Sequence, residues 1–363
     1  MPLDTIRTRL KQRRLDALLV TQPENRRYLS GYTANDSSIA ESAGVLLIKA
    51  KGEPLLLTDA RFALQAEREA PGFAMRLYQR GLLALLKQLL PRLAIRRLAF
   101  EPHWMLHSTA EALLKMTGAL GIEAVPVSGL VETMRRCKTK TEIERIRAAV
   151  LLNEQVFRTV YSILRPGQTE RQVADRLEMT MRQMGAEGPA FDTIVGAGPN
   201  GALPHAVPSD RPLGQGEPIV IDMGLRLAGY CSDMTRTVVL GEPDDKTKEI
   251  IRIVRRAQLA ATQVIRAGCT GREADRAARQ VISAAGYGKY FGHGLGHGVG
   301  LAVHEAPALN RRNRGQLAPG MVVTVEPGIY LPEWGGVRLE NMVVVQKAGC
   351  ELLNQDTTFL DID

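Results

Sequence analysis

With 363 residues, of which 45% are hydrophobic and 24% charged, the chain has the composition of a globular protein, which excludes disordered and fibrous classes. This length predicts two domains. The net charge of +8 would favour acidic partners, but Lys and Arg are scattered without interleaved aromatic residues, so we expect no nucleic-acid binding.

The sequence shows no signal peptide, membrane span or cysteine motif. The first residues lack an apolar signal core, and no apolar run is long enough for a membrane helix. The four cysteines lie far apart without a CxxC pair, so neither a disulfide framework nor a zinc finger is indicated. We therefore expect a cytoplasmic protein with no membrane partner.

The first part of the chain alternates short apolar runs with helical patterns, which is typical of an α/β domain. The apolar runs predict strands at 17–20, 44–48, 54–59 and 97–100. Helices are predicted near 64–70 and 108–116. His103 and His107 have the i, i+4 spacing of a metal pair, but without acidic or cysteine partners in regular spacing we interpret them as surface or core histidines.

The sequence changes character near residue 134, where apolar residues fall on one helical stripe up to Leu164. We place the domain boundary just before it, giving domains at 1–130 and 131–363. Thr169 with Gln172, and Thr270 with Glu273, have the spacing of capping boxes that begin two further helices. The second domain thus combines long helices with strands.

Residues 217–240 predict a β-hairpin that carries two aspartates. With a turn centred between Leu227 and Ala228, Asp222 would stand directly opposite Asp233 on one face. Like charges in such positions repel, which favours a cation between them.

Residues 322–345 predict a second hairpin of the same kind. If its turn centres at Glu333, Glu326 stands opposite Glu340. Two facing carboxylate pairs in one domain suggest a duplicated half with pseudo-twofold symmetry.

The stretch HGLGHGVGLAVHE, residues 293–305, contains three histidines separated by glycine and small apolar residues. Alternating glycines disfavour a helix and allow close approach of a ligand, so we expect a tight strand or loop with a metal or proton-transfer site. Four carboxylates and one imidazole would balance two divalent cations, and Mn²⁺, Co²⁺, Fe²⁺ and Zn²⁺ all suit such ligands. Each acidic residue taken alone has a blander interpretation as a solvated side chain.

The chain resembles the pita-bread metallopeptidase family, which includes prolidase, aminopeptidase P and methionine aminopeptidase. The resemblance rests on five motifs in the family's order: FDTIVGAGPNGALPHAVPSD, DMGLRLAGYCSDMTRT, HGLGHGVGLAVHE, TVEPGIY and GVRLEN. It implies an α/β N-terminal creatinase-like domain followed by an α+β pita-bread catalytic domain with pseudo-twofold symmetry. The extra N-terminal domain points to the Xaa-Pro dipeptidase and Xaa-Pro aminopeptidase branch and away from methionine aminopeptidase.

The resemblance also implies roles for individual residues. The two metals would be bound by Asp222, Asp233, His297, Glu326 and Glu340, with Asp233 and Glu340 as bridges. His205, His293, His304 and Glu326 would be the catalytic group, and Glu326 would accept a proton from the attacking water. His205, His304 and Arg338 would contact the substrate.

The function that follows is hydrolysis of the bond between an N-terminal residue and proline. Two divalent ions are expected as cofactors, Mn²⁺ or Co²⁺ first and Zn²⁺ or Fe²⁺ as alternatives, and small peptides with proline in second position as substrates. Family members are often homodimers, which we expect here too. The alternatives are a non-catalytic pita-bread binding module and a creatinase-like amidinohydrolase, and the five intact ligands disfavour both.

Two positions depart from the family pattern. Asn341 stands where an aspartate is common after the bridging glutamate, and Ala308 stands where many prolidases have an arginine that grips the dipeptide carboxylate. Arg311, Arg312 or Arg314 could replace that arginine. The choice between dipeptidase and aminopeptidase stays open.

Overall fold

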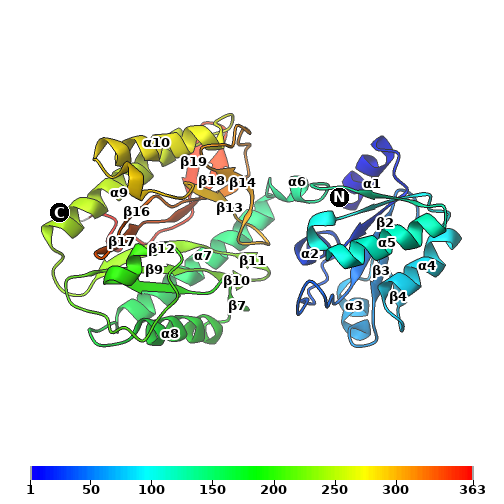
Figure 1. Cartoon of the computed structure of the whole chain (residues 1–363), viewed down its shortest axis with the longest axis horizontal. Helices are drawn as coiled ribbons and strands as arrows, with labels where there is room; N and C mark the ends of the chain where they lie inside the picture. Colours follow the sequence, from blue (N-terminus) through cyan, green and yellow to red (C-terminus); the bar gives the residue numbers. More distant parts are fainter. Residues whose placement is uncertain (1, 362–363) are drawn as a thin grey trace. The chain divides into compact units, whose positions relative to one another are not determined.

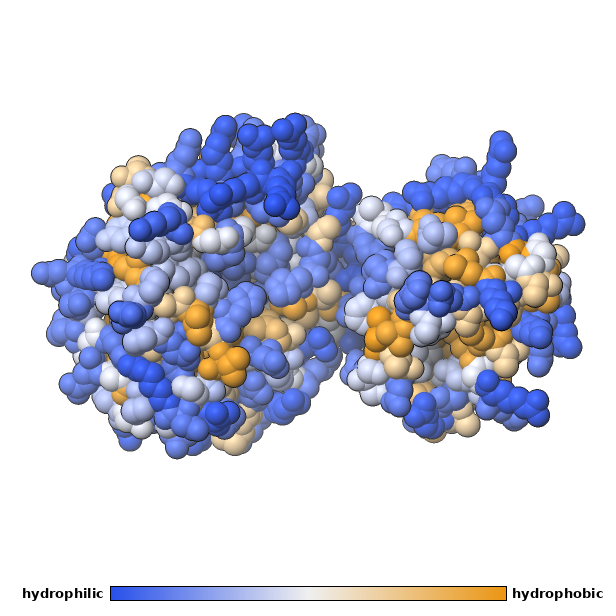
Figure 2. All heavy atoms as spheres, viewed as in Figure 1, coloured by the Kyte–Doolittle hydropathy of each residue, from blue (hydrophilic) through white to orange (hydrophobic). Residues whose placement is uncertain are grey.

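The computed structural model describes residues 2–361 and consists of two compact units, one ending at Arg135 and the other beginning at Arg136 (Figure 1). Within this described part, no helix is both long and apolar enough to cross a membrane. Polar side chains cover most of the face shown in Figure 2, with small apolar patches between them.

The N-terminal unit is built around one mixed sheet with the strand order β4-β3-β2-β1-β5-β6. Its strands are β1 (Ala17–Val20), β2 (Val45–Lys49), β3 (Leu55–Thr58), β4 (Ala74–Leu77), β5 (Arg97–Phe100) and β6 (Glu123–Pro126). Its helices are α1 (Pro2–Gln12), α2 (Pro23–Ser30), α3 (Ala63–Glu69), α4 (Leu82–Arg92), α5 (His107–Ala119) and α6 (Glu132–Arg135), with a 3₁₀ turn, η1 (Pro102–Trp104). All the strands and helices predicted for this region are confirmed.

Helices cover both faces of this sheet, which explains why its strands are continuous apolar runs without alternation. Leu18 packs into the cluster with Ile6 of α1 and Leu29 of α2, whereas Leu19 packs on the opposite face against α4 and α5. All four residues of β1 are buried. The N-terminal unit therefore has a two-sided core of its own.

The described part of the C-terminal unit contains two pairs of long helices and four sheets, of which the largest has five strands. The helices are α7 (Lys140–Tyr161), α8 (Glu170–Gln183), α9 (Asp245–Val264) and α10 (Gly271–Ala284). The first-half strands are β7 (Gly188–Pro189), β8 (Ile194–Ala197), β9 (Pro218–Met223), β10 (Leu225–Leu227), β11 (Tyr230–Cys231) and β12 (Met234–Val239), with the 3₁₀ helix η2 (Gly198–Ala202). The second-half strands are β13 (Gly296–Gly298), β14 (Glu305–Leu309), β15 (Val322–Val325), β16 (Gly328–Leu331), β17 (Gly335–Arg338), β18 (Asn341–Gln346) and β19 (Gly349–Leu352), preceded by η3 (Gly288–Tyr290).

Each half of this unit pairs a sheet with two covering helices, as Figure 1 shows. In the first half, α7 and α8 pack on the sheet β12-β9-β8 through one apolar cluster. In the second half, α9 and α10 pack on the sheet β14-β13-β15-β18-β19 through another. The predicted capping boxes begin α8 and α10, and Thr139 with Glu142 forms a third one at the start of α7. The repeated arrangement agrees with the pseudo-twofold symmetry expected from the two hairpins.

The predicted registers of the two acidic hairpins have different outcomes. In the second, Gly328 pairs with Arg338 and Val325 with Asn341, so the register centred at Glu333 is confirmed on both sides of Glu326 and Glu340. In the first, Asp222 pairs with Thr235, and the predicted direct pairing with Asp233 is wrong.

The physical reason for this error is the turn of the first hairpin. Leu227 pairs with Tyr230, so the turn residues are Ala228 and Gly229, which have φ values of 49° and 83°. Two consecutive positive φ values define the two-residue type I′ turn that suits the twist of a hairpin. The register is therefore displaced by two residues, and Asp222 and Asp233 still line the same cavity.

The glycine-rich stretch forms β13 between β14 and β15, as the prediction of a tight strand or loop required. A Cβ atom at Gly296 would lie 2.2 Å from the carbonyl oxygen of Thr324, and one at Gly298 would lie 2.5 Å from that of Ala306. These glycines therefore permit close packing of neighbouring backbone around His297.

Candidate metal centre and active site

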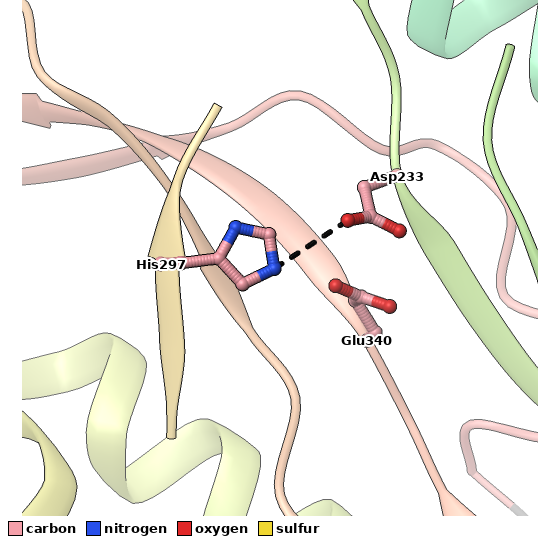
Figure 3. Close-up of side chains that lie close together, drawn as sticks. All are labelled: Asp233, His297 and Glu340. Carbon is pink, nitrogen blue, oxygen red and sulfur yellow. Dashed lines mark ion pairs between the residues drawn. The ribbon is translucent and has the colours of Figure 1, made fainter. Parts of the chain in front are cut away.

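Three of the predicted ligands form one tight group in the C-terminal unit. Asp233 lies between β11 and β12, His297 lies in β13, and Glu340 lies between β17 and β18. One ligand atom from each lies within 4.8 Å of the others. Figure 3 shows the three side chains pointing toward one another from these separate segments, with the ion pair between His297 and Asp233.

The other two predicted ligands lie beside this group and have different partners. Glu326 places Oε1 at 3.3 Å from His297 Nε2 and accepts a hydrogen bond from Thr324 Oγ1. Asp222 accepts a hydrogen bond of 2.6 Å from Arg338 Nη2 through Oδ2, while its buried Oδ1 has no hydrogen-bond partner in the structure. All five side chains line one cavity.

The crowding of carboxylates has a clear electrostatic signature. Burial and the neighbouring charges of Glu340 and Asp222 raise the pKa of Asp233 well above its ordinary value. Burial and the charges of Glu326 and Asp222 do the same to the pKa of Glu340. These shifts are what unrelieved negative charge produces, and a bound cation would reverse them.

His297 is oriented by the backbone so that one ring nitrogen faces the carboxylates. Its Nδ1 lies 3.1 Å from the carbonyl oxygen of Gly298, an acceptor that calls for a proton on Nδ1. Nε2 then points at Asp233 and Glu326. Burial lowers the pKa of this imidazole, but Glu326, the Gly298 carbonyl and the charge of Asp222 together outweigh burial and raise the pKa overall.

Arg338 anchors a chain of hydrogen bonds along one side of the cavity. Its Nη1 donates to the hydroxyl of Tyr330 at 2.8 Å, and that hydroxyl lies 3.0 Å from Nε2 of His293. Nδ1 of His293 lies 2.8 Å from the carbonyl oxygen of Gly294, so both ring nitrogens are engaged. Burial lowers the pKa of His293, which favours a neutral ring that accepts from Tyr330 and donates to Gly294.

The cavity has a volume of about 560 Å³, and part of its wall is apolar. Phe191, Ile194 and Val207 contribute to this wall. His205 and His304 also line the cavity, and both are exposed. The ring of His304 contacts that of His297 edge-on, with centroids 4.2 Å apart. All the predicted site residues therefore lie at one cavity.

Sequence reasoning missed the residues that hold the predicted ones in place. Tyr330 joins Arg338 to His293, Thr235 Oγ1 donates to Glu340 at 2.7 Å, and Thr324 Oγ1 donates to Glu326 at 3.1 Å. Thr235 and Thr324 lie in strands, and each is two residues from a predicted ligand just beyond the strand end, a spacing that favours the same face. This two-residue spacing could have identified both threonines from the sequence.

A group of buried carboxylates around one imidazole, held by two similar half-domains, defines a metallopeptidase of the pita-bread fold. The chain belongs to Metallopeptidase family M24, whose family profile matches residues 144–347, and residues 2–137 match the Creatinase/Prolidase N-terminal domain. The family and the fold expected from the five motifs are thereby confirmed.

Individual relatives extend over nearly the whole chain. An uncharacterized peptidase of Bacillus subtilis is 39% identical over 349 residues, covering 96% of each chain. The structure of an Xaa-Pro dipeptidase from Bacillus anthracis is 40% identical, with a TM-score of 0.91 and 98% of each chain covered. That of an X-Pro aminopeptidase from Thermotoga maritima is 39% identical, with a TM-score of 0.85 over 94% of this chain and 96% of the other.

Proposed function

We propose that this metallopeptidase is a dinuclear enzyme that hydrolyses the bond between an N-terminal residue and proline. The observation that carries the proposal is the convergence of Asp222, Asp233, His297, Glu326 and Glu340 on one cavity. The similar solved structures from Bacillus anthracis and Thermotoga maritima are named for Xaa-Pro cleavage, which supports the choice of bond.

The residues present fit a pair of divalent ions. Four carboxylates and one imidazole nitrogen supply the hard and borderline donors that Mn²⁺, Co²⁺, Fe²⁺ and Zn²⁺ accept. Asp222 Oδ1 is buried without a partner, which is costly unless a donor or a cation meets it. When bound, such ions polarise the scissile carbonyl and lower the pKa of water.

The protein's own groups supply positioning and proton transfer. We assign proton acceptance from the attacking water to Glu326. Burial raises the pKa of this carboxyl, but the hydrogen bond and charge of His297, together with the charges of His293 and Arg338, outweigh burial and lower the pKa overall. His205 and His304 lie at the cavity and are free to contact the carbonyl oxygen or the departing nitrogen. His293 has both ring nitrogens engaged, so we assign it to orienting Tyr330 and Arg338.

Proline suits this cavity for a chemical reason. The nitrogen of an Xaa-Pro bond carries no hydrogen, so a peptidase that docks its substrate as an added strand loses one hydrogen bond there. Recognition through ions, imidazoles and an apolar wall does not need that hydrogen. The wall formed by Phe191, Ile194 and Val207 offers apolar contact for a pyrrolidine ring.

The choice between dipeptide and longer substrates depends on whether a cationic side chain binds the carboxylate of the dipeptide. Ala308 offers no charge, whereas Asn310 lines the cavity and is followed by the exposed Arg311 and Arg312. Substitution of Arg311 by alanine should raise the KM of an Xaa-Pro dipeptide more than that of an Xaa-Pro-Xaa tripeptide if this arginine grips the dipeptide. Equal effects on both peptides would favour the aminopeptidase assignment.

The decisive experiment measures hydrolysis of Xaa-Pro dipeptides and Xaa-Pro-Xaa tripeptides after chelation and reloading with Mn²⁺ or Co²⁺. We expect cleavage of at least one class, with two ions bound per chain by elemental analysis. Asp233→Asn should lower kcat by more than about 100-fold, since changes to groups behind metal ligands alone cost 10- to 100-fold.

The matched control is Asp210→Asn, which removes an exposed carboxylate that forms an ion pair with the exposed Arg171. Its kcat and metal content should equal those of the wild type. Full activity of folded Asp233→Asn would refute the metal assignment, and failure of the loaded wild type to cleave either peptide class would refute the function.

A further inference from the structure

We propose that a buried ion pair between Lys138 and Glu305 positions His304 and the segment before Asp233 for the reaction. Lys138 Nζ lies 2.6 Å from Glu305 Oε1, and the two side chains are 1% and 9% exposed. This inference rests on the proposed function, because it assigns supporting residues to that same active site. Neither residue lines the cavity.

Lys138 is held firmly by backbone contacts at the start of the catalytic unit. Its N–H donates to the carbonyl oxygen of Gly320 at 2.8 Å, and its ammonium group also reaches the carbonyl oxygen of Arg136 at 3.3 Å. Gly320 in turn donates to the carbonyl oxygen of Val345 in β18. The ammonium group is therefore a fixed point to which Glu305 is attached.

Glu305 lies where two elements of the active site meet. It directly follows His304 and pairs with Gly298, the neighbour of His297, across β13 and β14. The register shifts between His297 and Gly298, so the regular ladder is interrupted beside the ligand. An interrupted ladder holds a side chain less firmly than a continuous one, and the ion pair supplies the missing restraint at this point.

The carboxylate of Glu305 also supports the turn before His304. A Cβ atom at Gly300 would lie 2.5 Å from Glu305 Oε1, which shows how closely the carboxylate packs under this turn. The carbonyl oxygen of Gly300 accepts from the N–H of Cys231 at 2.8 Å, and Cys231 lies two residues before Asp233. One buried carboxylate thus connects to the His304 loop and to the segment carrying Asp233.

Replacing both Lys138 and Glu305 by apolar residues distinguishes a positioning role from a merely stabilising one. Removing one partner of a buried ion pair is strongly destabilising, whereas replacing both by apolar groups of similar volume is often neutral for stability. We therefore compare Lys138→Met, Glu305→Leu and the double variant in the Mn²⁺-loaded enzyme. Arg171→Met/Asp210→Leu, which removes an exposed pair of the same unit, is the matched control.

We expect both single variants to lose thermal stability and the double variant to recover a melting temperature near that of the wild type. With an Xaa-Pro substrate, the double variant should keep a kcat about 10- to 100-fold below the wild type with little change in KM, because the histidine is no longer oriented. A double variant that recovers both stability and kcat would show that the pair is only structural.

Two further measurements keep the inference testable if the double variant does not fold. Glu305→Asp keeps the charge opposite Lys138 but shortens the side chain, and we expect a folded enzyme with lowered kcat; unchanged kcat would contradict the proposal. The rate at which diethyl pyrocarbonate modifies His304, read by mass spectrometry, should rise in this variant, with the exposed His107 as internal reference. An unchanged modification rate would contradict this inference, and the rate can be measured even if the wild type cleaves no Xaa-Pro peptide. Failure of this inference is therefore distinguishable from failure of the proposed function.

Discussion

Arg338 neutralises one oxygen of Asp222 and leaves the other for a different partner. The guanidinium also donates to Thr235 and to the Tyr330 hydroxyl, so its orientation is determined by several bonds. Burial lowers the pKa of Arg338, but its electrostatic interactions with Tyr330, Asp222 and Glu326 outweigh burial and raise the pKa well above the ordinary value. A permanently charged Arg338 therefore limits the charge that bound ions have to balance.

Tyr330 provides a test of this chain of hydrogen bonds. Burial raises its pKa to about 12, so its hydroxyl is protonated in the neutral range and can donate to His293. Tyr330→Phe leaves Arg338 and His293 each without one buried partner, which should cost about 1–3 kcal/mol of unfolding free energy. We also expect kcat to fall about 10-fold or more, since the orienting bonds are lost.

Urea denaturation and steady-state kinetics check this prediction. Tyr290→Phe, in the same unit, is the control, because Tyr290 makes ring contacts with Tyr287 and Lys289. Equal effects of the two substitutions on kcat would contradict a special role for Tyr330.

At the scale of elements, the hairpins show what sequence reasoning could reach. The register of β16 and β17 followed from the position of Glu333, which has a φ of 63°. The register of β9 and β12 was missed, because composition does not say whether Leu227–Ala228 or Ala228–Gly229 forms the turn. The face was still right, since a two-residue displacement preserves the side of the sheet.

The sequence could predict which side chains line the cavity, but not the residues that hold them in place. Acidic residues and histidines in ordered motifs identified which side chains meet in the cavity. Their supporting bonds depend on contacts between distant segments, such as Thr235 with Glu340 or Lys138 with Glu305. Periodicity along one strand cannot reveal such pairs, because they depend on how the two half-domains pack.

Helix capping offers a prediction for α9, which covers the second sheet. Asp244 accepts a hydrogen bond of 2.7 Å from the N–H of Thr247, and its interactions with Thr247 lower the pKa of Asp244. Asp244→Ala should therefore lower the free energy of unfolding by about 1 kcal/mol at pH 7.

The pH dependence of this cap has a definite sign. Because the folded-state pKa lies below the unfolded one, the contribution is present above the unfolded value and is lost as pH falls through the folded value. Urea denaturation should show a difference between wild type and Asp244→Ala that is constant from pH 7 to about 5 and shrinks below about pH 4. A constant difference at all pH values would contradict this account.

At the scale of the whole molecule, charge is divided unevenly between the two units. Residues 1–135 contain 19 Lys and Arg against 13 Asp and Glu, and so carry six of the eight net positive charges. Residues 136–363 are nearly balanced overall, yet they concentrate five potential metal ligands in one cavity. Repulsion among these carboxylates is therefore a local cost of folding the catalytic unit.

Metal binding should relieve that cost and stabilise the catalytic unit selectively. A metal at 100 times its dissociation constant adds about 2.7 kcal/mol to the stability of a folded state that alone binds it. Hydrogen exchange should show added protection in β12, β13 and β18 when Mn²⁺ is supplied, and little change in β1 and β5, which belong to the other unit. The reference is Asp233→Asn, in which this added protection should largely disappear.

The affinity should also depend on pH in one direction. Asp233 and Glu340 have raised pKa values in the absence of metal, so a cation has to displace protons from them. The protection produced by a fixed Mn²⁺ concentration should therefore increase as pH rises from acidic to neutral. Protection that was independent of pH, or equal in the two units, would mean that relief of carboxylate repulsion does not drive the binding.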